Sequence, residues 1–395
     1  MKILMIHNKY QFQGGEDSVF QIESDMLSKH GHKVEQLIFD NKEIKGAFEK
    51  FLLVLRGIYN SQSAKELEKV IARFSPDIIH VHNFFPLASP SIFYVAKRKH
   101  IPVVVTLHNF RLICPTAVLY FHGKIYEKNI HSIIPWDGIL KGVYRNSRLQ
   151  TAGLAVITTF HNLIGTWRNK VNKFIVLTEF AQKKFKDSIL RVSEDQFAVK
   201  PNFVEDNGYA QKAREDFFLI VGRLSEEKGI LTILESLNLG TFKLVIIGDG
   251  PLKDQVQSAI RAKPNVTYLG FQQKPVIMDY LKRCRALLFP SVCYEGFSMT
   301  LLEAFSAGTP VIASKLGSMA EIVQDHENGL HFEPGNPQDM VDKINLINED
   351  PDLAQKLSQN ARKTYMDLYT PEKNYTILLD IYTQLLLRKN PAVKQ

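Results

Sequence analysis

Short apolar runs alternate with amphipathic segments along the whole chain. In the first half, six such runs have the length of a strand: KILMIHN at 2–8, KVEQLIF at 33–39, DIIHVHN at 77–83, PVVVTLH at 102–108, FIVLTE at 174–179 and FAVKPN at 197–202. The second half repeats the pattern with FFLIVGRL at 217–224, KLVIIGDG at 243–250, VTYLGF at 266–271, ALLFPS at 286–291, PVIAS at 310–314 and GLHFEP at 329–334. Apolar strands separated by amphipathic helices indicate parallel sheets that helices cover on both faces.

Because both halves show this pattern, we expect an α/β protein of two doubly wound domains. The break falls in the polar, weakly periodic segment 201–216. The expected domains are therefore 1–203 and 204–371. Apolar residues at helical spacing predict one more helix, at about 372–395.

Loops that follow strands are where such sheets bind ligands. The segment VGRLSEEKG, 221–229, is one of them and holds Arg223 and Lys228 between two glycines. An arginine fork and a lysine point charge on one loop suit a diphosphate group. The alternative is a surface loop in which Glu226 and Glu227 neutralise both cations.

Glycines mark two more loops. Gly248 and Gly250, in VIIGDGP, permit either close approach of a ligand or an ordinary sharp turn. The G-x-G-x-x-G fingerprint of dinucleotide binding is absent there. Gly14 and Gly15 precede an amphipathic helix, whose free amides and dipole form a candidate anion site. The alternative is a simple helix start, favoured by the two acidic residues that follow.

His108 follows the apolar run PVVVTL. An imidazole at that strand end can donate a hydrogen bond or take a proton near neutral pH. A satisfied structural histidine is the alternative, and we assign no role to His80 or His82.

The segment YEGFSMTLLEAFSAGTPVIAS, 294–314, holds two carboxylates, Glu295 and Glu303. If the helix begins near Ser298 to Thr300, both acids can face one cleft with the first-turn amides between them. This arrangement offers acceptors for sugar hydroxyls and amides for phosphate oxygens. The alternatives are a capping box between Thr300 and Glu303, and an exposed loop acid at Glu295.

The net charge of +8 is uneven. Residues 1–200 contain 28 Lys and Arg against 17 Asp and Glu, whereas residues 201–395 contain 21 against 24. The densest basic segment, 120–174, also contains Trp136 and Trp167, which fits contact with an anionic membrane or a phosphorylated lipid. A solvated basic face with core tryptophans is the equal alternative. No nucleic-acid-binding motif accompanies the charge, so nucleic acid is not an expected partner.

Three cysteines at no metal-like spacing, and no signal-peptide pattern at the N-terminus, favour a cytoplasmic location. The uncharged stretches 78–96 and 149–167 contain several polar residues, so neither fits a membrane-spanning helix. We expect a cytoplasmic protein with the option of peripheral binding to the inner face of the cell membrane.

Taken in order, these segments resemble the family 4 glycosyltransferases of the GT-B fold over nearly the full chain. The most specific element is the E-x7-E pattern of Glu295 and Glu303. GRLSEEKG, GDGP, the N-terminal glycine pair, TLHNF and PNFVED agree with the family in order and spacing. The resemblance implies two Rossmann-like domains facing across a cleft, the N-terminal one for the acceptor and the C-terminal one for the nucleotide-sugar. It also implies that the last helix packs back onto the N-terminal domain.

The resemblance implies a role for each catalytic candidate. Glu295 would hold hydroxyls of the transferred sugar, Arg223 and Lys228 would bind the diphosphate, and His108 would contact the donor sugar near its reactive carbon. Glu303 would accept hydrogen bonds from the ribose hydroxyls.

Further donor contacts are implied on both domains. Gly15 would approach the phosphate, and the base would lie near 268–272. The expected donor-binding set is Gly15, Gly222, Arg223, Lys228, Gly248, Gly270, Phe271, Glu295, Gly296, Phe297, Ser298, Met299, Thr300, Leu301 and Glu303.

Two positions depart from the family pattern, since Phe203 and Ser298 stand where the family often has glycine. Family members transfer with retention of configuration. Cations and a helix N-terminus can stabilise a departing diphosphate without a metal, so no cofactor and no metal are expected. The D-x-D at Asp350 to Asp352 is interpreted as a helix start.

We therefore expect a retaining glycosyltransferase of the hexosyltransferase type. It would move a sugar from a nucleotide-diphosphate-sugar to a hydroxyl of a glycan or lipid-linked acceptor, in cell-surface polysaccharide or glycolipid biosynthesis. The alternatives are a GT-B-fold nucleotide-sugar epimerase, which needs no acceptor, and a non-catalytic membrane-associated subunit.

Overall fold

The computed structural model describes residues 1–9, 14–41, 54–210 and 213–389. Three predicted segments extend beyond this: residues 10–13 of the N-terminal glycine loop, 211–212 of the linker and 390–395 of the last helix lie outside the described residues.

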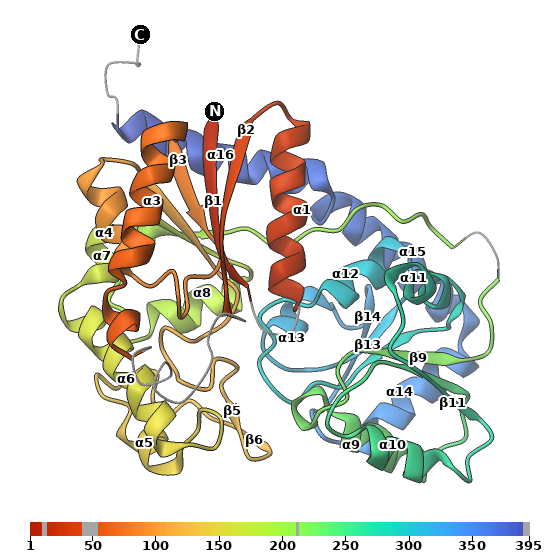
Figure 1. Cartoon of the computed structure of the whole chain (residues 1–395). Helices are drawn as coiled ribbons and strands as arrows, with labels where there is room; N and C mark the ends of the chain where they lie inside the picture. Colours follow the sequence, from red (N-terminus) through yellow and green to blue (C-terminus); the bar gives the residue numbers. More distant parts are fainter. Residues whose placement is uncertain (10–13, 42–53, 211–212, 390–395) are drawn as a thin grey trace. The chain divides into compact units, whose positions relative to one another are not determined.

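The chain forms two compact units, coloured by sequence in Figure 1. The first comprises Met1–Val118, Tyr126–Pro201 and Asn374–Gln395, and the second comprises Leu119–Ile125 and Asn202–Lys373. The chain passes to the second unit after Pro201 and returns after Lys373, whereas we expected the divisions after 203 and 371. The segment 119–125 differs more from the prediction, because it was expected in the N-terminal domain.

The first unit contains a sheet of six parallel strands in the order β2-β1-β3-β4-β7-β8. The strands are β1 (Lys2–Lys9), β2 (Lys33–Asp40), β3 (Ile78–Val81), β4 (Val103–Leu107), β7 (Lys173–Val176) and β8 (Phe197–Val199). Because β3 lies on the other side of β1 from β2, the order of the strands reverses between β1 and β3.

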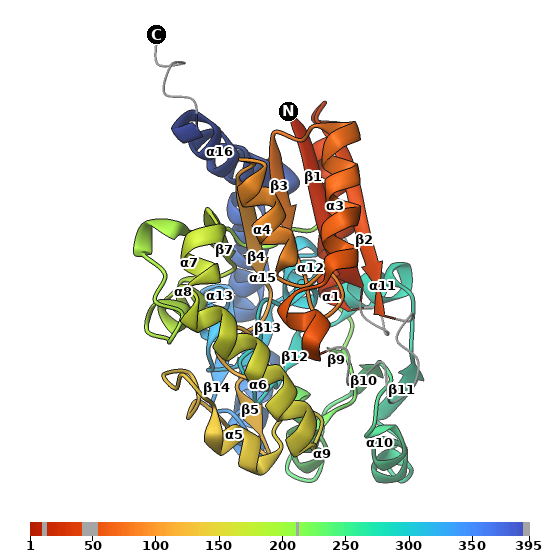
Figure 2. The same ribbon diagram turned by 60° about the vertical axis from the view of Figure 1, so that its left-hand side comes forward.

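Helices cover both faces of this sheet (Figures 1 and 2). The described helices of this unit are α1 (Gly15–Lys29), α3 (Ser61–Phe74), α4 (Ser91–Arg98), α5 (Trp136–Lys141), α6 (Arg148–Leu163), α7 (Thr166–Lys170), α8 (Glu179–Lys186) and α16 (Pro371–Lys389). A short 3-10 turn, Glu194–Gln196, precedes β8. The helix predicted for the C-terminal segment is α16, and its residues from Asn374 belong to the first unit.

The second unit contains another sheet of six parallel strands, in the order β11-β10-β9-β12-β13-β14. The strands are β9 (Phe218–Val221), β10 (Leu244–Ile247), β11 (Val266–Gly270), β12 (Leu287–Phe289), β13 (Val311–Ser314) and β14 (Gly329–Phe332). The helices are α9 (Ile230–Ser236), α10 (Lys253–Ile260), α11 (Lys274–Arg283), α12 (Met299–Ser306), α13 (Ser318–Ile322), α14 (Pro337–Glu349) and α15 (Pro351–Leu368).

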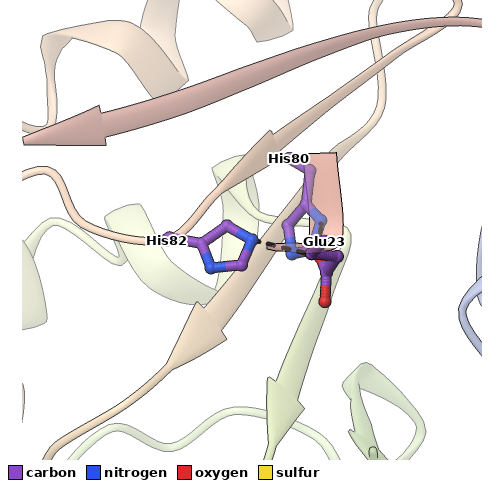
Figure 3. Close-up of side chains that lie close together, drawn as sticks. All are labelled: Glu23, His80 and His82. Atoms are coloured by element: carbon purple, nitrogen blue, oxygen red, sulfur yellow. Dashed lines mark hydrogen bonds and ion pairs between the residues drawn. The ribbon is translucent and has the colours of Figure 1, made fainter. Parts of the chain in front are cut away.

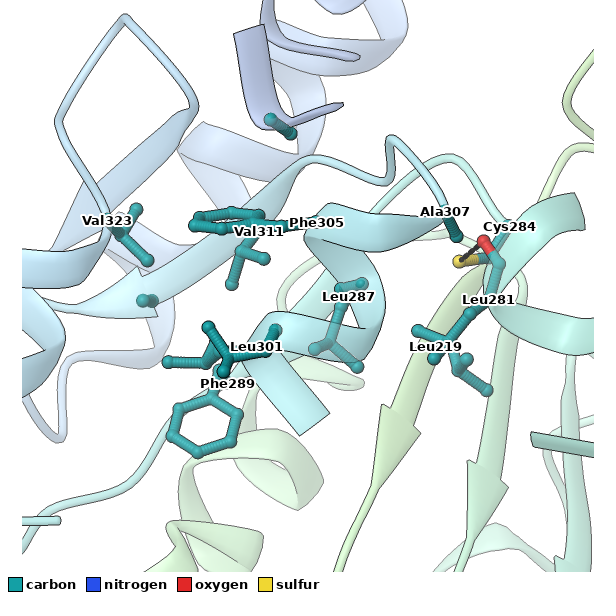
Figure 4. Close-up of a cluster of buried hydrophobic side chains, with 14 of the residues drawn as sticks. Leu219, Leu281, Cys284, Leu287, Phe289, Leu301, Phe305, Ala307, Val311 and Val323 are labelled. Atoms are coloured by element: carbon teal, nitrogen blue, oxygen red, sulfur yellow. Dashed lines mark hydrogen bonds between the residues drawn. The ribbon is translucent and has the colours of Figure 1, made fainter. Parts of the chain in front are cut away.

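Alternate residues of the second sheet point to opposite faces, as the two-residue period of a strand requires. On β9, Leu219 packs into one buried cluster, whereas Phe218 and Ile220 pack into another. Figure 4 shows the first cluster, where Leu301 and Phe305 of α12 lie over the strands. Both faces are therefore buried, which is why the strands appear in the sequence as continuous apolar runs.

The predicted architecture of two doubly wound α/β sheets is confirmed, and each of the twelve predicted runs contains a strand. Apart from β1 and β2, which each extend one residue further, the strands are shorter than the runs, because the last polar residues of those runs already belong to loops. A small antiparallel hairpin, β5 (Tyr120–Phe121) with β6 (Lys124–Ile125), was not predicted.

Candidate functional site

The strand order of the second sheet reverses between β9 and β12. From β9 the chain adds β10 and β11 on one side, and then β12, β13 and β14 on the other. A doubly wound sheet opens a crevice at such a point, outside the carboxyl ends of its strands. The loops after β9 and β12 carry Arg223, Lys228 and Glu295, so three of the four predicted catalytic residues belong to one switch point.

Lys228 and Glu295 form an ion pair between these two loops. The Nζ of Lys228 lies 2.6 Å from Oε1 of Glu295, and the Ser291 hydroxyl donates to the same oxygen over 2.6 Å. Burial by itself lowers the pKa of the Lys228 ammonium, but the charge and the hydrogen bond of Glu295, together with the nearby Cys293 and Glu227, outweigh burial and raise that pKa above its usual value. Lys228 therefore stays charged, and its contact with Glu295 joins the 222–229 loop to the exit loop of β12.

Glu226 and Glu227 do not pair with the two cations, as the alternative of a neutralised surface loop would require. Glu227 accepts a hydrogen bond of 2.7 Å from the Ser225 hydroxyl, and within the described ranges neither acid forms an ion pair with Arg223 or Lys228. Arg223 is exposed, and no carboxylate of the described part of the chain lies within ion-pair distance of its guanidinium. The structure thus leaves this guanidinium open to an anionic ligand.

Glu303 lies in the second turn of α12. The helix begins at Met299 with Ser298 as the N-cap, so Thr300 is inside the helix and the predicted capping box with Glu303 is wrong. The carboxylate is instead 3.1 Å from Nζ of Lys274 on α11. Burial raises the pKa of Glu303, and Lys274 opposes that rise.

The N-terminus of α12 is open. Ser298 makes no side-chain cap, and first-turn amides have no acceptor within their own helix. Leu301 is fully buried, so only its backbone could meet a ligand. Phe297 packs partly against the core, with its ring 5.9 Å from that of Tyr369. Gly296 and Met299 flank the same turn.

Two of the predicted glycines, Gly248 and Gly250, are needed for loop packing. A Cβ on Gly248 would lie 1.8 Å from the carbonyl oxygen of Gly222, and a Cβ on Gly250 would lie 2.5 Å from that of Leu224. The GDGP turn is thus a support for the 222–229 loop. The backbone N–H of Gly248 donates to the carbonyl of Gly270 over 2.8 Å.

Phe271 follows β11 and is 74% exposed. A large aromatic ring left in solvent at a strand end has a free face on which a planar base could stack. The sequence predicted this segment, 268–272, as the place of the base, and the exposure of the ring is compatible with that prediction.

His108 of the first unit lies just after β4 and is more constrained than the sequence indicated. Its Nε2 is 3.1 Å from Nδ1 of His82, which in turn contacts Glu23 through Nε2 over 3.1 Å. Burial, reinforced by His82, holds the pKa of His108 well below its usual range, so the imidazole is neutral. His108 also borders a small cavity, which Asn109 and Arg111 help to line.

Gly15 opens α1, and Gly14 is the N-cap. The carboxylate of Asp17 accepts a 2.7 Å hydrogen bond from the Gly14 amide and lies 2.8 Å from Nε2 of His7. The acidic residues therefore do favour the helix start, as the alternative stated. The contact of Gly15 with a phosphate stays a prediction.

Glu23, His80 and His82 bring three ligand-type atoms within 4.8 Å of one another (Figure 3). Each is already engaged: Lys200 Nζ lies 2.7 Å from Glu23, and the Tyr382 hydroxyl lies 2.7 Å from Nδ1 of His80. The ammonium occupies the place of a cation beside the carboxylate, so this trio is a hydrogen-bonded core.

The D-x-D segment is a helix start, as predicted. Asp350 caps α15 by accepting a 2.9 Å hydrogen bond from the Leu353 amide, and Pro351 occupies the first helical position.

Comparison with known proteins agrees with this arrangement. The family model described as glycosyltransferase family 4 matches residues 24–207, and the model described as glycosyl transferases group 1 matches residues 201–364. Together the two models span residues 24–364, which contain the switch-point loops of the second sheet and every strand of the two six-stranded sheets except β1. The chain belongs to glycosyltransferase family 4.

Relatives of this family 4 glycosyltransferase include two that align over most of their length. The O-antigen chain mannosyltransferase C of Escherichia coli is 25% identical, over 99% of this chain and all of that protein. The alpha-monoglucosyldiacylglycerol synthase of Acholeplasma laidlawii is 24% identical, over 87% of this chain and 82% of that protein.

Solved structures share the fold of this family 4 glycosyltransferase. The crystal structure of Anabaena Alr3699/HepE in complex with UDP superposes with a TM-score of 0.70 at 18% identity, over 98% of this chain and 99% of that one. The sucrose-phosphate synthase of Thermosynechococcus elongatus superposes with a TM-score of 0.71 at 17% identity, over 98% of this chain and 99% of that one. The fold is therefore GT-B, as the sequence motifs indicated.

Sequence reasoning missed Glu23 and Lys200 of this family 4 glycosyltransferase. A signal existed for each: Glu23 lies on the buried side of an amphipathic helix, and Lys200 directly follows a strand. Their partnership was not visible, because the two side chains are 177 positions apart.

The basic segment 120–174 contains one exposed and one buried tryptophan. Trp136 on α5 is 62% exposed, whereas Trp167 is 1% exposed and packs against Phe84 and Phe93. Trp167 therefore fits the alternative of a core tryptophan, whereas Trp136 is exposed, as contact with a membrane would require. No helix in the described ranges is long and apolar enough to span a bilayer.

Proposed function

We propose that this family 4 glycosyltransferase moves a hexosyl group, with retention, from a nucleotide-diphosphate-sugar to a hydroxyl of a glycan or lipid-linked acceptor. Its setting would be the synthesis of a cell-surface polysaccharide or glycolipid. The observation that carries the proposal is the charged cluster of the second unit, where Lys228 and Glu295 meet at the strand-order switch point and Arg223 lies open beside them.

The diphosphate is assigned to the cations of this cluster. Arg223 offers a planar fork of donors, and Lys228 offers a compact charge that the protein keeps protonated. The open first turn of α12 adds backbone amides and the positive end of a helix dipole. These groups can stabilise the charge that develops on a leaving diphosphate, so the proposed chemistry needs no resident metal.

The nucleoside is assigned to Glu303 and Phe271. An ionised carboxylate can accept two hydrogen bonds from the adjacent hydroxyls of a ribose. Phe271 offers an exposed ring for the base. Glu295, held by Lys228 and Ser291, is assigned to the hydroxyls of the transferred sugar.

Retention is the proposed stereochemistry. The acceptor hydroxyl would attack the anomeric carbon from the face that the diphosphate leaves and pass its proton to the departing phosphate oxygen. The proposal draws on the two relatives named above, one named for an O-antigen chain and the other for the synthesis of alpha-monoglucosyldiacylglycerol.

A membrane surface is the proposed location of the acceptor. The exposed apolar residues of α6 are Leu149, Val156, Phe160 and Leu163, which share one side of the helix by their spacing. On α5, Trp136 and Leu140 are each 62% exposed. Apolar side chains beside an excess of cations match a surface of anionic lipid, which takes both kinds of group.

The first experiment is thermal unfolding of the whole protein with a panel of nucleoside diphosphates. A ligand at 100 times its dissociation constant adds about 2.7 kcal/mol to stability. We expect stabilisation by one base, and its loss in Arg223→Ala. Absence of any shift in the wild type would contradict the donor site.

The second experiment separates transfer from isomerisation. The protein is incubated with the matching nucleotide-sugar, with and without polyprenyl-linked or diacylglycerol acceptors, and the anomer of the product is determined by NMR. Acceptor-dependent transfer with retention is expected, unchanged by EDTA. Conversion of the donor sugar without any acceptor would instead indicate an epimerase.

A further inference from the structure

Four side chains, of which Lys200, Glu23 and His82 are buried and His108 is partly buried, form one continuous hydrogen-bonded chain in the first unit. Lys200 Nζ lies 2.7 Å from Glu23 Oε2, Glu23 Oε1 lies 3.1 Å from His82 Nε2, and His82 Nδ1 lies 3.1 Å from His108 Nε2. Figure 3 shows how Glu23 and His82 point toward each other beside His80. The chain begins at the end of β8 and ends at the loop after β4.

The donors and acceptors of this chain can be assigned from its charged end. The Lys200 ammonium can only donate, and the Glu23 carboxylate can only accept. Glu23 stays ionised, because Lys200 and the two histidines outweigh the effect of burial and hold its pKa well below the usual range. The Nε2 of His82 must therefore carry a proton.

The assignment then passes to His108. Burial lowers the pKa of His82 to about 4, so this imidazole is neutral and its Nδ1 is an acceptor. His108 is also neutral and must donate to His82 from Nε2. The proton-free nitrogen of His108 is consequently Nδ1.

The neighbouring groups agree with this order. His80 Nδ1 lies 3.1 Å from the same Glu23 oxygen and 2.7 Å from the Tyr382 hydroxyl, so it adds a polar contact beside the carboxylate. Asn374 of α16 accepts from Lys200 over 3.0 Å. The Lys200 ammonium is thus the donor in both of its hydrogen bonds, to Glu23 and to Asn374.

Nδ1 of His108 has no hydrogen-bonding partner among the described residues. It does not belong to the buried polar atoms that lack a partner, so this nitrogen is accessible. The imidazole borders the small cavity it shares with Asn109 and Arg111. An open acceptor at the edge of a cavity is suited to a hydroxyl group.

We propose that Lys200 and Glu23 are positioning residues that act through His82 to keep His108 in the Nε2–H tautomer. His108 thereby presents Nδ1 as a hydrogen-bond acceptor to a sugar hydroxyl. The identity of that ligand rests on the function proposed above, whereas the tautomer does not.

The test is a long-range ¹H–¹⁵N correlation spectrum of the full chain labelled with ¹⁵N-histidine, with the His108 signals identified by their loss in His108→Asn. The wild type is expected to show the Nε2–H tautomer. In Glu23→Gln, the amide oxygen must face Lys200 and the NH₂ group must face His82. The tautomers of His82 and His108 are therefore expected to reverse, and transfer to fall at least tenfold.

The matched control is the double variant Glu23→Gln with Lys200→Met. Without the ammonium, the amide is free to turn its oxygen to His82, so the original tautomer and most of the transfer rate are expected to return. A purely structural role would give no reversal and no rescue. A wild-type spectrum with His108 protonated on Nδ1 would overturn the proposal even if no variant folds.

The two proposals fail separately. If the tautomers behave as expected but the wild type transfers no sugar to any acceptor, the proposed function is wrong and the assignment of the proton chain stands. If transfer is normal but Glu23→Gln leaves the His108 tautomer unchanged, the positioning role is wrong.

Discussion

Glu303 owes its properties to the residue at which α12 begins. Since the helix starts at Met299, the carboxylate lies in the second turn, where burial raises its pKa and Lys274 limits the rise. A capping role would have tied the same carboxylate to the backbone. The position of one N-cap thus decides whether this acid can serve a ligand.

Binding of the nucleotide is expected to weaken as the pH falls, at a higher pH than for an ordinary glutamate. Only the ionised carboxylate is a full acceptor, and a raised pKa means that protonation begins earlier on acidification. Lys274→Met removes the cation that lowers this pKa. The affinity of this variant for the nucleotide should therefore begin to fall at a higher pH than that of the wild type. Titration calorimetry across the acidic range measures this.

Lys282→Met, on the same helix but without an ion pair to Glu303, is the control. If the nucleotide affinities of Lys274→Met and the wild type fell over the same pH range, the assignment of Glu303 to the nucleotide would be contradicted.

Gly248→Ala is expected to destabilise the second unit by about 3 kcal/mol, because the new Cβ would lie 1.8 Å from a backbone oxygen of the 222–229 loop. Gly335 also has a positive φ, +76° against +149° at Gly248, but it has open space around it, so Gly335→Ala should cost only the roughly 1–2 kcal/mol of the left-handed conformation. Denaturant unfolding compares them, and equal losses would disprove the packing role of Gly248.

At the scale of elements, the positions of the strands along the chain could be predicted, but which strands lie side by side in a sheet could not. Twelve apolar runs are long enough to mark strands buried on both faces. The hairpin of β5 and β6 has two residues in each strand, which is too short for any period to appear. The pair of Lys228 and Glu295 joins loops 67 positions apart and depends on β9 and β12 being neighbours.

The exposed stripe of α6 is expected to bind anionic vesicles. Leu149→Glu with Leu163→Glu should abolish flotation with vesicles rich in phosphatidylglycerol, because it places charge where apolar side chains would enter the interface. The two side chains are 83% and 61% exposed, so the fold should be unaffected. Binding by the wild type should weaken as salt rises.

Leu239→Glu changes an equally apolar, 50% exposed side chain of the second unit and should leave flotation unchanged. Flotation of the double α6 variant at the wild-type level would exclude this helix as the membrane contact.

At the scale of the molecule, the second unit has a core of its own. Both clusters that cover its sheet consist of buried residues between Val204 and Tyr369. The proposed diphosphate and ribose contacts also lie within this one contiguous segment. The first unit, by contrast, is assembled from segments at both ends of the chain.

The fragment 202–373 is accordingly expected to unfold cooperatively and to bind the same nucleoside diphosphate as the whole protein, within about tenfold in affinity. Circular dichroism in denaturant and titration calorimetry check the two statements. A fragment that folds but binds no nucleotide would show that the first unit supplies essential contacts.

During synthesis, α16 leaves the ribosome after all the other described helices of the two units. The 174 positions between Lys200 and Asn374 take about 10 to 30 seconds to translate at roughly 5–20 residues per second. Over that time Lys200 and His80 lack the partners that Asn374 and Tyr382 later provide. A premature stop or a protease cut before residue 374 would therefore leave the first unit unfinished while sparing the second.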